Sequence, residues 1–208
     1  MRKKSFFFIV FEGIEGTGKS YQINKLYKNL IGKNFDAVKT REPGGTPTAE
    51  KIRKLIFSKN SIQFDKLTDF YLMCAARNEH LKKFLLFAKK QKKIVICDRF
   101  TDSTYAYQVI GSKIDKKFNL LNQNYILKKF KPNLTIVLRS NFETIFSRIK
   151  KRKKNNKFDK LKINFYKKAQ NAFVSRAKNN KNYYVFDSSK NTPDLEKKLI
   201  NLIIKKLN

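Results

Sequence analysis

A glycine-rich segment, Gly13–Ser20, limits the possible folds of this chain more than any other feature. The preceding residues, Phe6–Phe11, are aromatic and β-branched, which is typical of a buried strand. After Ser20, apolar residues recur at helical spacing, so the segment joins a strand to a helix. Every fixed position of the pattern G-x-x-x-x-G-K-[ST] is met. Sequence and context together predict a phosphate-binding loop.

The residue types in this loop explain the predicted chemistry. Glycines let backbone N–H groups curl around phosphate oxygens, and the helix N-terminus adds partial positive charge. Lys19 can then reach the outer phosphates, and the Ser20 hydroxyl can ligate Mg²⁺. The alternative, a chance glycine-rich turn, does not explain why both flanks also fit. The sequence therefore predicts a nucleoside-triphosphate site.

The rest of the chain alternates between strand and helix patterns, which is typical of an α/β fold. We expect further strands at 36–40, 93–98, 134–138 and 183–186, and helices at 49–57, 67–88, 165–178 and 195–207. Another helix begins at Phe142. No internal repeat or long linker is present, so we expect residues 1–208 to form a single domain.

The chain is strongly basic, with 48 Lys and Arg against 16 Asp and Glu, a net charge of +32. Such a charge attracts polyanions. The lysines are spread along the chain, and Asn, Ile and Phe are also abundant, so a composition bias explains the charge better than a dedicated nucleic-acid surface. We therefore expect no specific nucleic-acid partner.

Cysteine usage and hydropathy point to the cytoplasm. Cys74 and Cys97 have no metal-ligand spacing, which favours free thiols in a reducing compartment. His80, the single histidine, is expected to cap or pack a helix rather than to bind metal. No apolar stretch reaches membrane-spanning length.

Charged residues follow the expected strands. Asp98 ends the strand at 93–98, where a second Mg²⁺-organising carboxylate belongs. Arg41 follows the strand at 36–40, at the start of a Pro-Gly-Gly turn, and offers a bidentate donor suited to phosphate. Arg77 and Glu79 interrupt an apolar helix, either as a solvated face or as the lining of a substrate cleft.

Residues 148–162 are strongly basic, with nine Lys or Arg and one acid. This segment is either a basic loop or a lid that closes over phosphates and adds cationic donors.

These motifs, taken in order, resemble bacterial thymidylate kinases over essentially the whole chain. The most specific is T-R-E-P-G-G-T at 40–46, and it is joined by Asp98-Arg99 with Ser103, Ala106-Tyr107-Gln108 and Pro132–Thr135. The resemblance implies a three-layer P-loop NTPase fold with a five-stranded parallel sheet, flanking helices and a small lid. It also implies a homodimer that transfers the γ-phosphoryl group of ATP to dTMP, giving dTDP for dTTP synthesis.

The resemblance also implies residue roles. The whole loop (Gly13, Ile14, Glu15, Gly16, Thr17, Gly18, Lys19 and Ser20) would bind ATP, with Ser20 and Asp98 on Mg²⁺. Arg41 and Arg99 would hold the dTMP phosphate, and Glu15 would meet the sugar 3′-hydroxyl. The thymine would be faced by Met73, Arg77, Ser103, Thr104 and Gln108. Lys19, Asp98 and Arg99 would act in catalysis together with Arg152 from the lid, for which Arg148 and Lys153 are the competing choices.

The sequence departs from the family pattern in three places. Met73 stands where the family usually has a thymine-stacking Phe, and Arg139 stands where Asp is common. In the lid, residues 156–159 read N-K-F-D in place of N-R-F-E. Met73 leaves open a monophosphate kinase with another or relaxed base preference. The net charge leaves open a P-loop protein that binds nucleic acid, although no nucleic-acid module is recognisable.

Overall fold

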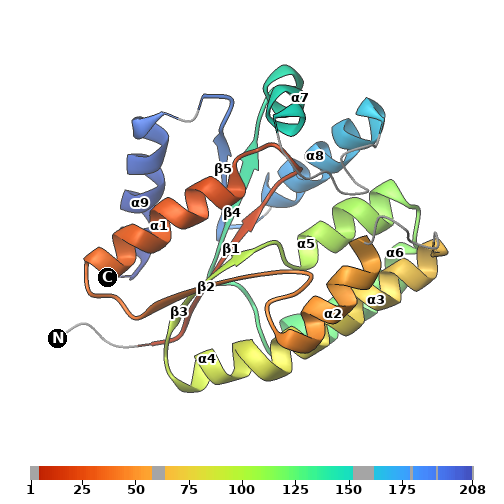
Figure 1. Ribbon diagram of the computed structural model, residues 1–208, viewed down its shortest axis with the longest axis horizontal. Coiled ribbons are helices and arrows are strands. Elements are labelled where there is room, and N and C mark those ends of the chain that lie inside the picture. The colour runs from red at the N-terminus through yellow and green to blue at the C-terminus, as the bar shows by residue number, and fades with distance from the viewer. Residues whose placement is uncertain (1–4, 58–63, 152–161, 179, 191, 208) are drawn as a thin grey trace.

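A five-stranded parallel sheet forms the centre of the molecule (Figure 1). The computed structural model describes residues 5–57, 64–151, 162–178, 180–190 and 192–207. The strands are β1 (Phe7–Glu12), β2 (Ala37–Arg41), β3 (Ile94–Asp98), β4 (Leu134–Arg139) and β5 (Tyr183–Asp187), in the spatial order β2-β3-β1-β4-β5. All five predicted strands are confirmed to within a residue at each end.

Helices cover both faces of this sheet. They are α1 (Lys19–Gly32), α2 (Pro47–Phe57), α3 (Lys66–His80), α4 (Leu86–Lys90), α5 (Thr101–Thr104), α6 (Lys116–Leu127), α7 (Phe142–Lys150), α8 (Ile163–Lys178) and α9 (Pro193–Leu207). Two π-helical segments, η1 (Leu81–Leu85) and η2 (Tyr105–Gly111), continue α3 and α5. Within the described ranges, no helix is long and apolar enough to cross a membrane.

The predicted helix boundaries need three corrections. The single helix expected at 67–88 is α3, η1 and α4 in succession, because a π-helical turn interrupts the regular hydrogen-bond ladder. No helix was expected between 101 and 127, yet α5, η2 and α6 lie there. The lid was expected to begin at Arg148, but residues 148–150 are the last turn of α7. Residues 152–161 of the expected lid lie outside the described residues.

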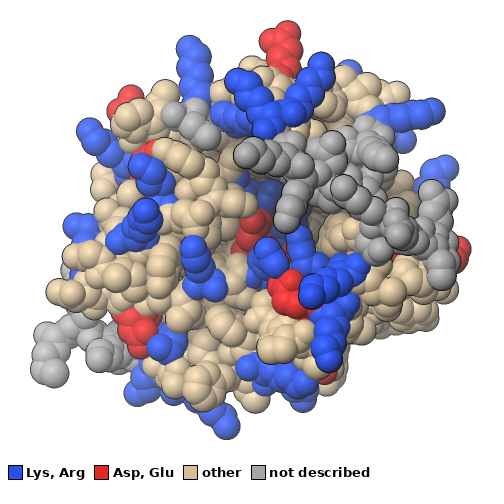
Figure 2. Space-filling view, viewed as in Figure 1, with Lys and Arg blue, Asp and Glu red and all other residues tan. Residues whose placement is uncertain are grey.

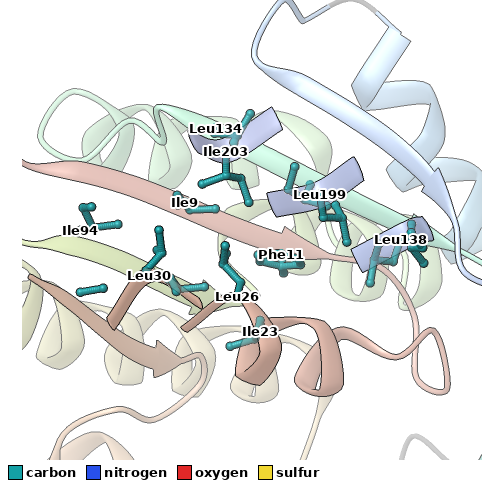
Figure 3. Close-up of a cluster of buried hydrophobic side chains, with 14 residues drawn as sticks. Ile9, Phe11, Ile23, Leu26, Leu30, Ile94, Leu134, Leu138, Leu199 and Ile203 are labelled. Atoms are coloured by element: carbon teal, nitrogen blue, oxygen red, sulfur yellow. The ribbon is translucent and has the colours of Figure 1, made fainter. Parts of the chain in front are cut away.

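β1 is buried on both faces because helices cover both sides, as is usual for a parallel sheet. Ile9 and Phe11 point to one face and pack with α1 and α9, as Figure 3 shows. Phe8 and Val10 point to the other face, against η1, α4 and α6. Fully burying such a side chain contributes about 1.5–3 kcal/mol, so these two clusters hold the three layers together.

The sheet register brings polar residues to one edge. Arg41 of β2 and Phe11 of β1 both lie opposite Asp98 of β3, and Glu12 lies beside Val137 of β4. Because the strands are parallel, their carboxyl ends and the loops that follow them meet at this edge. Basic side chains are spread over the face drawn in Figure 2 and do not form a single stripe.

Both cysteines are free, as expected. Cys97 is buried in β3, and burial raises the pKa of its thiol well above the ordinary value. His80 packs inside the protein at the end of α3, which confirms the structural role expected for it. Among the described residues, no cluster of His, Cys, Asp and Glu could hold a metal ion by itself.

Candidate active site

The phosphate loop lies between β1 and α1, as predicted. Gly13, Gly16 and Gly18 all have positive φ angles (136°, 77° and 82°), which side chains rarely tolerate. A Cβ at Gly13 would lie 2.3 Å from the Leu138 carbonyl oxygen of β4. The loop can therefore follow this path only with glycine at that position, and it leads directly into α1 at Lys19.

Lys19 is buried within the loop that it serves. Its Nζ donates to the carbonyl oxygens of Gly13 and Ile14, at 2.9 Å each. Burial, and then the nearby charge of Arg99, lowers the pKa of Lys19 from 10.5 to about 8. Burial therefore disfavours the charged ammonium group, and the negative charge of a bound phosphate would stabilise it.

Ser20 and Asp98 face each other across the sheet edge. The Ser20 hydroxyl donates to Oδ2 of Asp98 at 3.0 Å. The second carboxylate oxygen, Oδ1, is buried and has no hydrogen-bond partner within the described part of the chain. Mg²⁺ in phosphate-transfer sites is commonly held by one or two protein oxygens, with waters and substrate phosphates completing the shell. The pair fits that donor set.

Arg99 forms the centre of the site. The residue adopts φ 73°, and its guanidinium donates to the Gly13 carbonyl (2.9 Å) and to Ser103 Oγ (3.1 Å). Its other terminal nitrogen donates to Glu15 Oε1 at 2.7 Å. The Tyr107 hydroxyl also donates to Glu15. The Arg99 guanidinium stacks over the Tyr107 ring, and its Cζ lies 5.1 Å from the ring centre. Arg99 and Glu15 thus hold each other in fixed positions.

Charge compensation keeps Glu15 ionised. Burial raises the pKa of its carboxyl, but Arg99 and Lys19 outweigh that effect, and the net pKa is below the ordinary value. Conversely, burial of Arg99 is outweighed by Tyr107, Glu15 and the other acids nearby, so the pKa of Arg99 is raised. Both groups remain charged at neutral pH.

Glu12 holds the turn that follows Arg99 and was not predicted as a site residue from the sequence. Its carboxylate accepts from the backbone N–H groups of Phe100 (2.8 Å) and Ser103 (3.2 Å) and from Ser103 Oγ (2.6 Å). Burial, and then the Asp102 charge, raises the pKa of Glu12 to about 7. Glu12 therefore fixes the turn that carries Arg99. An acid that ends an apolar strand just before the loop was the only signal in the sequence.

Arg41 projects from the end of β2 as predicted. Its guanidinium is about half exposed and makes a two-point contact with Glu50 of α2, at 2.9 and 3.2 Å. Arg53, which sequence reasoning missed, also lines the site. It donates to the Pro43 carbonyl at 2.7 Å and lies over the Phe57 ring. The two arginines and Phe57 form one wall of the site.

Arg77 is buried, which decides between the two sequence interpretations of it. It lines the cavity and pairs with Glu42 (Nε to Oε2, 2.6 Å). Glu79 instead contacts Lys83 and Thr48 and is absent from the cavity lining. Met73, one helical turn before Arg77, is also buried and lines the cavity. Of the two interpretations left open, the cleft lining holds for Arg77 and not for Glu79, and the ion-pair partner of Arg77 is Glu42.

One cavity brings these groups together. The predicted residues in its lining are Glu15, Lys19, Ser20, Arg41, Met73, Arg77, Asp98, Arg99, Ser103, Thr104 and Gln108. The lining residues missing from the prediction are Glu42, Pro43, Arg53, Phe57, Phe100 and Tyr107. Glu42, Pro43 and Tyr107 lie within motifs that were recognised, whereas Arg53 and Phe57 end an ordinary amphipathic helix and carry no local signal.

Two expectations concern residues near the loop. Arg152 and Lys153 lie outside the described residues. Arg148, on α7, donates to the carbonyl oxygens of Gly16 (3.1 Å) and Ser189 (3.3 Å), so it braces the phosphate loop. Arg139, the unexplained departure from the family pattern, forms an exposed ion pair with Asp187 at the neighbouring strand end, at 3.6 Å.

Comparison with known proteins identifies the family. A sequence model of the thymidylate kinase family matches residues 11–199. The chain is 39% identical to the thymidylate kinase of Acinetobacter baylyi over 168 residues, 80% of this chain and 82% of the relative. It is 37% identical to that of the Aster yellows witches'-broom phytoplasma over 204 residues, 96% of each chain.

A solved structure agrees with these sequence relatives. The crystal structure of thymidylate kinase from Ehrlichia chaffeensis aligns with a TM-score of 0.76 and 31% identity, and the alignment covers 98% of this chain and all of the other. This chain belongs to the thymidylate kinase family.

Proposed function

We propose that the cavity at the carboxyl edge of the sheet is where this protein transfers the γ-phosphoryl group of ATP to dTMP, giving dTDP and ADP. The observation that carries the proposal is the convergence on one cavity of the phosphate-loop residues Lys19 and Ser20, the carboxylate of Asp98, and four arginines from separate segments of the chain. Such a site suits phosphoryl transfer, which depends on positioning and on charge stabilisation and needs no covalent nucleophile.

The loop side of the cavity would hold ATP. Backbone N–H groups of residues 13–20 and the Lys19 ammonium would surround the outer phosphates. The negative charge of the phosphates would stabilise the buried ammonium group. Ser20 and Asp98 would hold Mg²⁺, with the unpartnered Asp98 oxygen as one ligand. Bound Mg²⁺ supplies neutralisation of phosphate charge.

The opposite side of the cavity would hold dTMP. Arg41 and Arg99 lie at the ends of adjacent β2 and β3, where two guanidinium groups can hold one phosphate. Glu15, fixed by Arg99 and Tyr107, would accept from the sugar 3′-hydroxyl. The base would lie among the remaining polar lining residues and Met73: Arg77, Ser103, Thr104 and Gln108.

The remaining catalytic cation would come from Arg152 in the lid. Gly16 stands where another branch of the family carries an arginine in the loop itself, so the loop does not supply this cation. Arg148, the competing choice on α7, would brace the phosphate loop through the Gly16 and Ser189 carbonyls. The transfer would then use positive charge from Lys19, Arg99 and the lid.

A homodimer is part of the proposal. Helices α3 and α6 lie side by side, joined by ring contacts between Phe70 and Phe118 (5.3 Å) and between Tyr71 and Phe118 (5.9 Å). Their outer surface exposes large apolar side chains: Leu67, Tyr71, Leu120, Leu121 and Tyr125. An exposed apolar face of this kind marks an interaction surface. The cytoplasmic location expected from the free thiols stays a prediction.

A coupled assay of ADP release tests the function directly. Purified protein with ATP and Mg²⁺ would be offered dTMP, dUMP, UMP, CMP, AMP and GMP in parallel. We expect a clear preference for dTMP. Comparable activity with several acceptors would support the relaxed-base alternative suggested by Met73, and no activity with any of them would reject a monophosphate kinase.

A binding measurement addresses the nucleic-acid alternative. We expect saturable dTMP binding that survives moderate salt, because the site is built from specific contacts. DNA binding that falls steeply with salt, without any affinity for mononucleotides, would favour the nucleic-acid alternative instead.

A further inference from the structure

His80 lies behind the cavity and forms hydrogen bonds with Thr40 of β2 and with Glu42, which lines the cavity. It is the single histidine of the chain and is completely buried. Its Nδ1 lies 2.8 Å from Oε1 of Glu42, and its Nε2 lies 2.8 Å from Oγ1 of Thr40. An ionised carboxylate can only accept, so Nδ1 carries the hydrogen and donates to Glu42.

Glu42 connects His80 to Arg77 on the proposed base-facing side of the cavity. Its second oxygen accepts from Arg77 Nε at 2.6 Å, and Arg77 also donates to the Phe100 carbonyl at 3.0 Å. Glu42 and Arg77 both line the cavity, whereas His80 does not. His80 can therefore act on a bound nucleotide only indirectly, and Glu42 connects it to Arg77.

The position of the imidazole ring is set from several sides. It stacks on Phe84 of η1, with ring centres 5.4 Å apart and planes 15° apart. A Cβ at Gly45 would lie 2.8 Å from Cδ2 of His80 and 2.4 Å from Oγ1 of Thr40. The glycine turn thus packs directly on this ring and on Thr40, and the ring has little freedom to turn away from Glu42.

The two nitrogens of the His80 ring form hydrogen bonds with different residues, Thr40 and Glu42. Thr40 immediately precedes Arg41, the proposed phosphate-holding residue on β2. Glu42 holds Arg77, the proposed base-facing residue on α3. The histidine is the one side chain among the described residues that hydrogen-bonds to both Thr40 and Glu42.

We propose that His80 is a positioning residue for dTMP recognition: by donating to Glu42 it orients Arg77 toward the base, and Thr40 holds the ring in the orientation that this requires. The inference rests on the proposed function. Thymine presents a carbonyl acceptor at the ring position where cytosine presents an amino donor, so a correctly oriented arginine favours dTMP over dCMP.

Amide substitutions can separate the two hydrogen bonds. In His80→Asn the amide nitrogen falls near the Nδ1 position and can still donate to Glu42. In His80→Gln the amide falls near the Nε2 position and can reach Thr40 only. His80→Phe keeps the ring stack on Phe84 and removes both bonds. Thr40→Val is the matched control, because it removes the Thr40 bond and leaves the histidine in place.

The assay is steady-state kinetics with dTMP, dCMP and ATP, at a temperature well below the melting temperature of every variant. For His80→Gln and His80→Phe we expect KM for dTMP to rise about tenfold, and the preference for dTMP over dCMP to fall by a similar factor. KM for ATP and kcat should stay within about twofold of wild type. His80→Asn should recover most of the loss, and Thr40→Val should show a smaller effect than His80→Gln.

A purely structural role would give a different pattern. It would lower the melting temperature and the active fraction without a selective change in KM for dTMP. An unchanged KM in His80→Gln would overturn the inference, as would equal losses in His80→Asn and His80→Gln, or a Thr40→Val effect as large as that of His80→Gln. Absence of dTMP phosphorylation by the wild-type protein would instead reject the proposed function.

Discussion

Replacing Lys19 by methionine should make the nucleotide-free protein more stable while abolishing catalysis. The ammonium group is buried, and burial lowers its pKa from 10.5 to about 8. Since a tenfold change in proton affinity corresponds to about 1.4 kcal/mol, the buried charge destabilises the folded state by about 3 kcal/mol at neutral pH. The loop therefore carries a destabilising charge that is useful only when phosphate is bound.

The net gain from the substitution is smaller than this charge term. Methionine fills a similar volume but leaves the Gly13 and Ile14 carbonyls without the lysine donor, which offsets about 1–2 kcal/mol. We therefore expect a gain in the free energy of unfolding of about 1–2 kcal/mol. For a chain of this size the melting temperature should rise by roughly 2–8 °C.

The pH dependence has a definite sign. Because the pKa of Lys19 is lower in the folded protein, the destabilisation is complete below pH 8 and disappears as the pH rises from about 8 towards 10.5. The stability difference between variant and wild type should thus be largest at pH 7 and shrink at pH 9.5. Urea unfolding at both pH values, without nucleotide, measures it.

The control is Lys28→Met, the same substitution at an exposed position of the same helix, which should change stability little at either pH. ATP should stabilise the wild type and the Lys28 variant but have much less effect on the Lys19 variant, whose turnover should fall by orders of magnitude. A Lys19→Met protein that is less stable than wild type at pH 7, or near-normal in activity, would refute the reasoning.

Four further substitutions test the remaining assignments. Asp98→Asn should lower kcat by about 100-fold or more and raise the Mg²⁺ concentration for half-maximal rate, because it removes the proposed carboxylate ligand; an unchanged Mg²⁺ titration would exclude that role. Met73→Phe should lower KM for dTMP about two- to tenfold by ring stacking, and a higher KM would mean that the ring does not fit. Leu121→Lys should convert the proposed dimer to monomer in sedimentation velocity; a dimer that persists in this variant would exclude the α3–α6 face as its interface. Arg152→Ala should lower kcat more than it raises KM for dTMP, and an effect on KM alone would move the catalytic role to another lid residue.

Local sequence patterns predicted the scaffold well. The strand, loop and helix around Gly13–Ser20 follow from side-chain periodicity and from glycines that need positive φ angles, and both are properties of neighbouring residues. Asp98 and Arg41 could be placed at the site because parallel strands bring their carboxyl ends to one edge. Helix α6 was missed because its apolar pattern is weak and its buried residues include Asn119 and Gln123.

Contacts between distant residues were not predictable in this way. Glu42 pairs with Arg77 and His80, 35 and 38 positions away, and no local pattern marks those partners. The sequence left Arg77 between a solvated face and a cleft, and its burial against Glu42 decided for the cleft. The ion pair between Arg139 and Asp187 likewise depends on two strands, β4 and β5, that are neighbours only in the folded sheet.

The sequence by itself determined the fold class, the phosphate loop and most of the residues that line the cavity, because these depend on local periodicity, backbone freedom and short motifs. The tertiary structure alone decided which charges compensate one another: Glu15 with Arg99, and Glu42 with Arg77. It also decided that the pKa of Lys19 is lowered and that the pKa of Glu12 is raised. A pKa depends on burial and on the surrounding charges, which only the folded chain defines.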